Sequence, residues 1–498
     1  MAMDDVKKPG SPVPAASDEK IESQHSEKYT ESISISEEHR QYLIDRHGTD
    51  QLDPCPEFDD ADPYNWPQSK KWLNLAFVAF HAFMATFTAS AIQSAFVNIA
   101  MDLGVTIQQA SYLTSLVIAV LGVAPLFWRP LADRFGRRPI LIVSLVVSLV
   151  GNIGCAKSPT YSTMGLCRAI TAFAICPAAA IGSGVVQEMF FKHQRARCMG
   201  IWTVFVTLGV PVGPLIFGFV ALRVSYRWIY WVLAITNGVH LILYFFLSSE
   251  TRYIHGQKHE AAPRSYSKKL FHFRRIDKTP LTVMDFVHPL RLALFPCVLI
   301  PAIAYSTVFA YANIMPTIEI PQLYVEDFHF NTQQVGLQFI AIIIGTLIGE
   351  QVGGFFSDRW MRQRRAHGAP EFRLWLSYFG YGISIAGIAV FLAQLQKAGQ
   401  LWNVIPTVGA GIASAGNQIV TTILITYAVD CHRREAAAIG VFITLVRQLW
   451  GFIGPFWFPD LIAKVGLGAT AGIFAAFIVV FSVVPTLLLQ WRGSRWHE

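Results

Sequence analysis

Twelve long apolar runs dominate the sequence between residues 71 and 490. At 1.5 Å of rise per residue, each run is long enough to cross the roughly 30 Å hydrocarbon core of a bilayer as a helix. Helices satisfy their own backbone hydrogen bonds, which lipid cannot do. We therefore predict an all-α membrane protein with twelve transmembrane helices. The predicted spans are 71–94, 108–128, 139–156, 161–187, 198–222, 228–248, 291–314, 334–357, 372–395, 401–428, 436–459 and 466–490.

The composition agrees with lipid as the main solvent. Hydrophobic residues make up 53% of the chain and charged residues only 15%, whereas a soluble domain carries about a quarter charged residues. The net charge of +7 sits in short loops between apolar runs, so we attribute it to membrane orientation rather than to nucleic-acid binding. The seven cysteines lack CxxC spacing and lie mostly in or beside apolar runs, which favours buried thiols over a metal site.

Basic residues divide unevenly between the two sides of the predicted membrane. Loops on the side of the N-terminus carry 23 lysines and arginines, and loops on the other side carry five. Because basic loops favour the cytosolic side, both termini are predicted to be cytosolic. We expect the plasma membrane, with the vacuolar membrane as the alternative.

Polar segments divide the chain into domains. Residues 1–70 are rich in Ser, Glu, Asp, Lys and Pro, which is typical of a disordered cytosolic tail. The longest internal polar stretch, 249–290, separates the apolar runs six and six and is predicted to be a cytosolic linker. The chain would then contain an N-terminal six-helix bundle (71–248), a C-terminal six-helix bundle (291–490) and a short cytosolic tail (491–498).

A short cationic loop follows the second apolar run. We call its residues 133–138 the signature loop, and its polar and glycine positions are Asp133, Arg134, Gly136, Arg137 and Arg138. So short a connection makes the two flanking helices antiparallel neighbours.

A weaker copy of this loop occurs in the second half, at Asp358 and Arg359. The repetition indicates a duplicated membrane protein. Gly354 precedes Asp358 by four residues and would permit close helix packing, whereas Arg129 occupies the equivalent position before Asp133. An arginine there must extend to water or to lipid headgroups.

The fifth apolar run carries three glycines near one face, Gly209, Gly213 and Gly218, together with Pro214. Small residues allow helices to approach closely, and proline bends a helix because it removes a backbone donor. A generic packing face is the alternative interpretation of this pattern.

Together these features resemble the major facilitator superfamily. The signature loop matches that family's loop between helices 2 and 3, and residues 209–218 resemble its antiporter motif with Phe217 in place of one glycine. The resemblance implies secondary transport by alternating access, with a proton gradient as the energy source and no cofactor. Further stretches resemble the fungal twelve-helix drug:proton antiporter branch: 62–63, 227–231, 250–253, 371–375 and 426–430.

The resemblance also implies a gate on the cytosolic side. It places Glu188 and Arg195, which follow the fourth run, next to the signature loop. Ion pairs there would form when the cytosolic mouth closes and break when it opens. The second half repeats the layout with Asp358, Arg359 and Asp430. A set of charges that only fixes the topology is the alternative.

Three charged residues fall inside apolar runs, where charge is costly and marks function: Arg168, Glu350 and Arg447. An arginine in helix 4 is linked to proton coupling in the family that the chain resembles, so Arg168 is one candidate. Glu350 is our leading candidate for a proton carrier. A structural Glu350–Arg447 pair is the alternative.

Family architecture places helices 1, 4, 7 and 10 around a central cavity. The polar residues that would line it for substrate binding are Gln93, Asn98, Tyr305, Asn313 and Asn417.

We predict a proton-coupled exporter of small organic molecules such as drugs, toxins or secondary metabolites. A proton-coupled importer of a polar or cationic nutrient such as a polyamine is the alternative, followed by a non-transporting membrane sensor. The sequence shows no phosphate-binding glycine pattern, nucleophile or metal constellation, so we expect no enzyme activity. The expected partners are a small-molecule substrate, protons and the lipid bilayer, without nucleic acid, and we expect a monomer.

Overall fold

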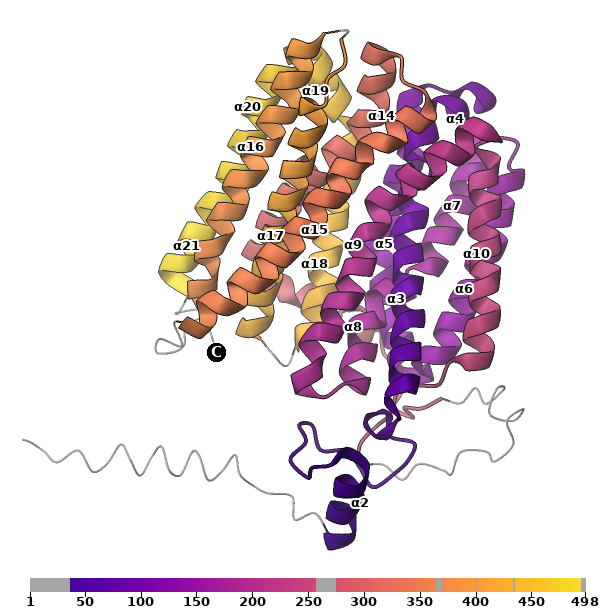
Figure 1. Cartoon of the computed structure of the whole chain (residues 1–498), viewed down its shortest axis with the longest axis vertical. Coiled ribbons are helices and arrows are strands. Elements are labelled where there is room, and N and C mark those ends of the chain that lie inside the picture. Colours follow the sequence, from indigo (N-terminus) through magenta and orange to yellow (C-terminus); the bar gives the residue numbers. More distant parts are fainter. Residues whose placement is uncertain (1–35, 257–274, 364–369, 400, 433–434, 494–498) are drawn as a thin grey trace, which may run out of the picture. The chain divides into compact units, whose positions relative to one another are not determined.

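The computed structural model describes residues 36–256, 275–363, 370–399, 401–432 and 435–493, and within these it is helical with no strands (Figure 1). The chain forms two compact units, one ending at Asp60 and the other beginning at Ala61. Each unit is described by itself below.

The first unit contains one helix, α2 (Glu37–His47). The Ser36 hydroxyl caps its start by accepting a hydrogen bond from the backbone N–H of His39, and Gly48 ends it in a left-handed conformation. Tyr42 donates a hydrogen bond of 2.9 Å to Asp60. The prediction of a disordered tail is therefore wrong for this segment, because local caps and polar contacts support a helix without a large apolar core. Residues 1–35 of the predicted tail lie outside the described residues.

The described part of the second unit has twelve helices that are long and apolar enough to cross a membrane, which confirms the predicted fold class. In chain order they are α3 (Gln68–Ser90) with η2 (Gln93–Ala95) and α4 (Phe96–Leu103), α5 (Ile107–Phe135), α6 (Arg137–Lys157), α7 (Tyr161–Ile175) with α8 (Pro177–Met189), α9 (Lys192–Arg223), α10 (Arg227–Leu247), α13 (Pro296–Phe309) with η4 (Ala310–Ile314) and α14 (Met315–Phe328), α15 (Thr332–Gln363), η6 (Pro370–Leu374) with α16 (Trp375–Ala398), α17 (Ile405–Cys431), α18 (Ala436–Ile453) with η8 (Gly454–Phe456), and α20 (Leu467–Ile478) with η9 (Val479–Val483) and α21 (Val484–Arg492).

The seventh helix differs most from its predicted span of 291–314. It runs from Pro296 to Phe328, because the π-helical turn η4 lets the chain continue into α14. Pro316, Glu319 and Pro321 resemble a loop in the sequence, yet they lie inside this helix. Neighbouring helices make such prolines tolerable in a membrane helix.

The helices pack in two sets. In the first set, α3 packs on α9, and α6 packs on α7 and α10; in the second set, α15 and α16 pack on α17, and α16 packs on α20. Buried apolar side chains form separate clusters in the two sets, except that Ile118 of α5 joins the second. We call the two sets the N-terminal half and the C-terminal half.

The bundle has two ends. We call the end that carries the signature loop the arginine-rich end. The other end, where α14 finishes and α15 begins, is the opposite end, and it is uppermost in Figure 1 near the labels α4, α14 and α19 (Phe458–Val465).

Candidate functional site

Helices α9 and α15 seal the two halves against each other at the opposite end. A Cβ atom added to Gly218 would lie 2.6 Å from the carbonyl oxygen of Thr332, and one added to Gly336 would lie 2.6 Å from that of Pro214. The Thr332 hydroxyl donates a hydrogen bond of 3.2 Å to the Gly218 carbonyl. Only glycine allows the two backbones to approach so closely.

Helices α5 and α18 form a second seal at the same end. The Gln108 amide donates to the Pro455 carbonyl at 2.6 Å, and the rings of Tyr112 and Phe456 stack with centroids 4.5 Å apart. Farther along α5, Gly122 leaves no room for a side chain because the Gln448 Cβ lies 2.8 Å from where its own Cβ would be.

The halves separate at the arginine-rich end, where a cavity of about 690 Å³ lies between them. It begins one turn beyond Gly122, at Pro125 and Leu126 of α5. Residues of α5, α8 and the linker line one side, and Ala437 and Ala438 of α18 line the other. The structure is therefore closed at the opposite end and open at the arginine-rich end.

A half-buried carboxylate holds the signature loop beside this cavity. Glu250 accepts hydrogen bonds from the first two backbone N–H groups of α6, those of Arg137 at 2.8 Å and Arg138 at 3.0 Å. Gly136 turns the chain at φ +96°, and a Cβ there would collide with Ile276 as well as with Glu250. Burial raises the pKa of Glu250, while these N–H groups lower it. The carboxylate thus caps the N-terminus of α6, where the helix dipole is positive.

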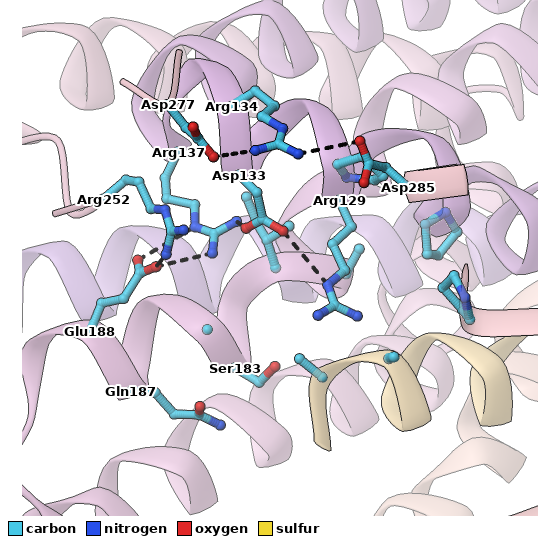
Figure 2. A pocket seen from close by; sticks show the side chains of 18 of the residues that line it. Arg129, Asp133, Arg134, Arg137, Ser183, Gln187, Glu188, Arg252, Asp277 and Asp285 are labelled. Atoms are coloured by element: carbon cyan, nitrogen blue, oxygen red, sulfur yellow. Dashed lines mark hydrogen bonds and ion pairs between the residues drawn. The ribbon is translucent and has the colours of Figure 1, made fainter. Parts of the chain in front are cut away.

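Ion pairs join this loop to α8 and to the start of the linker. Arg137 lies 2.9 Å from Asp133 and 3.0 Å from Glu188, and Arg252 lies 3.0 Å from the same Glu188 oxygen (Figure 2). The Glu188 and Arg137 side chains are 16% and 8% exposed, so these pairs are largely desolvated. The loss of one partner would leave another charge buried without compensation.

Arg134 holds the later part of the linker. It pairs with Asp277, lies 3.3 Å from Asp285 and donates a hydrogen bond to Thr279. Hydrogen bonds from the Thr279 backbone and side chain, followed by Arg134, lower the pKa of Asp277, and the Thr282 backbone and Arg134 lower that of Asp285. The signature loop therefore binds the linker at two places.

The other basic groups of this region have separate surroundings. Arg138 donates to the Phe245 carbonyl at 2.8 Å, and Arg195 donates to the Tyr64 hydroxyl at 3.4 Å. Arg129 lines the cavity and extends away from Arg134 in Figure 2. Its nearest carboxylate oxygen, on Asp133, is 3.9 Å away. The side chain of Arg129 therefore lies at the cavity rather than among lipid headgroups.

The observed ion pairs differ from those that a cytosolic gate between the two halves would require. The structure does bring the signature loop and Glu188 together, as the prediction requires. However, across the described ranges no ion pair joins a helix of one half to a helix of the other. The pairs are formed while the cavity is open, so a role in gating stays a prediction.

The second half has a smaller polar cluster at the corresponding place. Arg373 lies 3.2 Å from Asp430 and donates a hydrogen bond of 2.6 Å to Ser357. Arg359 is exposed, and the side chain of Asp358 lies outside the described part of the chain. A Cβ on Gly354 would meet nothing within 4 Å, so the predicted close packing at this glycine is not found.

The glycines of the α9 motif pack closely against helices of both halves. Gly209 and Gly213 face α3, where added Cβ atoms would lie 2.6 Å from the Phe83 carbonyl oxygen and 3.1 Å from that of Phe87. Gly218 faces α15 instead, across the seal described above. One helix therefore makes close backbone contacts with both halves, and the carbonyl of Pro214 is part of the second contact.

Arg168 is buried among backbone groups. Its guanidinium donates to the carbonyls of Leu113 at 3.2 Å and Ala89 at 3.1 Å, and to the Tyr230 hydroxyl at 3.3 Å. Asn152 lies next to it around a cavity large enough for about one water molecule. A role in proton coupling stays a prediction.

The proposed Glu350–Arg447 pair is not formed. Glu350 accepts a hydrogen bond from Gln418 of α17, and Arg447 donates to the Tyr305 hydroxyl at 3.0 Å and lies over the Phe309 ring. The prediction failed because both helices are apolar on most sides, so the sequence does not show which way each side chain points.

The predicted cavity residues are scattered along the bundle. Gln93, Tyr305 and Asn417 are buried, whereas Asn98 and Asn313 are half-buried. The 690 Å³ cavity is lined by none of them. Their role in substrate binding stays a prediction.

Sequence reasoning missed four residues that the structure makes prominent. Glu250, Arg252 and Arg373 stand out in the sequence only as parts of stretches that resemble the fungal branch, although a charge beside a helix end is a usable signal. Glu319 was missed because the seventh helix was predicted to end before it.

Comparison with known proteins identifies the class of protein. Residues 78–455 match the model of the Major Facilitator Superfamily, and this covers more than half of the chain. The chain belongs to this family, which consists of membrane transporters rather than enzymes. It is accordingly a multi-pass membrane transporter.

Relatives with names come from fungi. Efflux pump radE of Floropilus chiversii is 27% identical over 94% of this chain and 87% of the pump. MFS transporter cpaT of Aspergillus oryzae is 27% identical over 82% of this chain and 84% of its own length. Efflux pump vrtL of Penicillium aethiopicum is 25% identical over 89% and 91%, respectively.

Proposed function

We propose that the chain is a proton-driven exporter that moves small organic molecules out of the cytosol by alternating access. One observation carries this proposal: a cavity of about 690 Å³ lies between two halves that are open at one end and sealed at the other. Its volume of about 690 Å³ is within the range of pockets that hold drug-sized ligands. Two relatives named efflux pumps support the direction of transport.

The orientation follows from charge. Basic loops favour the cytosol, so the arginine-rich end is assigned to the cytosol and the cavity is open to it. The opposite end then faces outward, at the plasma membrane. A substrate would enter the cavity from the cytosol, and the seals α9–α15 and α5–α18 would separate to release it outside. Residues 209–218 of α9 resemble the family's antiporter motif, which supports antiport, and the same helix packs on α3 and on α15 at the outer seal.

A pair of glycine variants on α15 tests alternating access. Gly336→Val would force α9 and α15 apart at the outer seal, since its Cβ would meet the Pro214 carbonyl, whereas Gly354→Val enters open space. Both variants keep helix α15 and add the same side chain. We expect Gly336→Val to lose at least tenfold in transport with normal membrane insertion, and Gly354→Val to retain it. Equal activity of the two variants would contradict the proposed outer seal.

Direction is tested in cells that lack their own exporters. Cells that express the protein are compared for survival on a panel of toxins and for growth on a panel of nutrients, polyamines included. An exporter lowers the accumulation of at least one toxic compound in the cell. Better growth on a scarce nutrient with unchanged toxin accumulation would identify an importer instead.

A further inference from the structure

Helix α14 buries a carboxyl group within the membrane-spanning region. Glu319 is only 1% exposed, and its Oε1 atom is fully buried without a hydrogen-bond partner. The part of the chain that the structure describes offers it no ion-pair partner. An ionised carboxylate in this position would be strongly destabilising, because neither water nor a cation compensates its charge. In this conformation Glu319 is therefore the neutral acid.

The elements around α14 supply no cation close to Glu319. Those that pack most closely against it are η2, η4, η8 and α15, and Thr407 of α17 shares a hydrogen bond with Tyr324. The described titratable or charged groups on these elements and on α14 itself are Tyr311, Tyr324, Glu326, Asp327, Glu350, Arg359, Tyr427, Asp430 and Cys431. Arg359 lies 27 residues beyond Thr332 along α15, about 40 Å from the opposite end. The side chains of Asp358 and Arg362, at that same far end of α15, lie outside the described residues.

Glu319 belongs to the segment at which the two halves meet. It lies nine residues, or about 14 Å, from the end of its helix at Phe328. Helix α14 of the C-terminal half packs there against η2 of the N-terminal half. Any movement that opens the opposite end must separate these two elements.

Other buried polar atoms at this contact also lack partners. They are Oε1 of Gln93 and Oγ of Ser94 in η2, and Oδ1 of Asn313 in η4. A buried polar group without a partner destabilises the closed contact, and water relieves that cost. The contact is therefore prone to open to water, and water would reach Glu319 together with these groups.

We propose that Glu319 binds the proton that allows the outer seal to close. When the outer end is open, water reaches the carboxylate and one proton from the outside forms an O–H bond on it. The seal then closes over a neutral acid, because no cation is present to pair with a buried carboxylate. When water from the cytosolic side next reaches Glu319, the O–H bond breaks and the proton passes to that water.

The proposal rests on the proposed function and names a group for its proton coupling. It replaces Glu350 as the proton carrier, since Glu350 is less buried and already holds a hydrogen bond to Gln418. Glu319 is absent from the lining of the 690 Å³ cavity, so this conformation corresponds to the proton-loaded form before release.

The test measures closure directly rather than transport. Two fluorophores are attached through non-canonical amino acids at Met101 and Leu401, which are 79% and 82% exposed at the opposite end, one in each half. Single-molecule energy transfer in nanodiscs then reports the separation between the halves from pH 5.5 to pH 8.5. The variants are Glu319→Gln, Glu319→Asp and, as a matched control on the exposed face of the same helix, Glu326→Gln.

We expect the open population of the unmodified protein to rise at least threefold from pH 5.5 to pH 8.5. Glu319→Gln should remain closed at every pH, because glutamine resembles the protonated acid. Glu319→Asp and Glu326→Gln should keep the pH response. A full pH response in Glu319→Gln, or its loss in Glu326→Gln, would overturn the proposal.

Transport distinguishes this proposal from the function on which it rests. If Glu319→Gln loses the pH response while export by the unmodified protein ignores the proton gradient, the proposed proton coupling fails and the role of Glu319 in closure stands. If export needs the gradient and Glu319→Gln still responds to pH, only the role of Glu319 fails.

Discussion

The two halves of the transporter fix their arginine-rich ends by different means. In the N-terminal half, Glu188 pairs with Arg137 and Arg252, and Glu250 caps helix α6. In the C-terminal half, Arg373 holds Asp430 and Ser357. The halves share a helix pattern, yet among the residues that the structure describes the N-terminal network is larger and more deeply buried.

The difference lies in the linker. Arg252 and Glu250 belong to its beginning, and Arg134 holds Asp277 and Asp285 near its end. The N-terminal half and both described ends of the linker thus form one polar unit. We infer that this unit moves as a body, while the C-terminal half, with its local cluster, moves against it.

The largest effect is expected where two arginines share one carboxylate. Glu188→Gln leaves Arg252 without its partner and Arg137 with Asp133 alone. Uncompensated buried charge should cost about 3 kcal/mol, because the groups are largely desolvated. The expected result is a marked fall in the thermal unfolding midpoint of the purified protein. An unchanged midpoint would show that the network contributes little to the N-terminal half.

A smaller stability effect, with a clear effect on transport, is expected at Asp133. Asp133→Asn removes one of the two carboxylates that face Arg137 and the nearest one to Arg129. We expect transport to fall about tenfold, which equals about 1.4 kcal/mol, in protein that reaches the membrane. The measurement is substrate efflux normalised to surface protein.

Arg129→Gly is the matched variant for Asp133→Asn. It removes the neighbouring side chain, which has only a 3.9 Å contact, and it should retain transport. Full activity of Asp133→Asn would reduce the signature loop to an orientation signal.

The second half should respond more weakly. Asp430→Asn removes the carboxylate partner of Arg373 but leaves its hydrogen bond to Ser357. Asp430 is 25% exposed, so water compensates part of the loss, and we expect about 1 kcal/mol. The measurement is the same unfolding midpoint. A fall as large as that of Glu188→Gln would contradict the contrast between the halves.

The smallest effect is expected at the linker when the pH falls below about 4. The pKa values of Asp277 and Asp285 lie below their ordinary value of 3.8 in the folded protein. Their contribution to docking is therefore complete above pH 3.8 and is lost as the pH falls through the lower, folded values. A spin label at the exposed position Lys278 should gain mobility only below about pH 4. Arg134→Ala should release the same label at neutral pH.

The features predicted correctly from the sequence are those that the lipid environment restricts, because a chain crosses the bilayer only in a few kinds of structure. Apolar length sets the twelve helices, and the short cationic turn sets the contact between α5 and α6. Of the partners of Arg137, Glu188 lies 51 residues away and is expected there only from the family resemblance, whereas Glu250 lies 113 residues away and required the fold. Pro316 and Pro321 flank Glu319 and are typical of a loop in the sequence, so the sequence predicts that the seventh helix ends before Glu319. These prolines lie in a helix because η4 and the neighbouring helices stabilise it.

Proton-driven export can be measured with the purified protein in sealed vesicles. The purified protein is reconstituted into vesicles with the arginine-rich end outward and the interior acidic, and uptake of a substrate found in the accumulation screen is followed. We predict accumulation inside the vesicles that stops when a protonophore collapses the gradient. Accumulation that continues unchanged without the gradient would contradict the account.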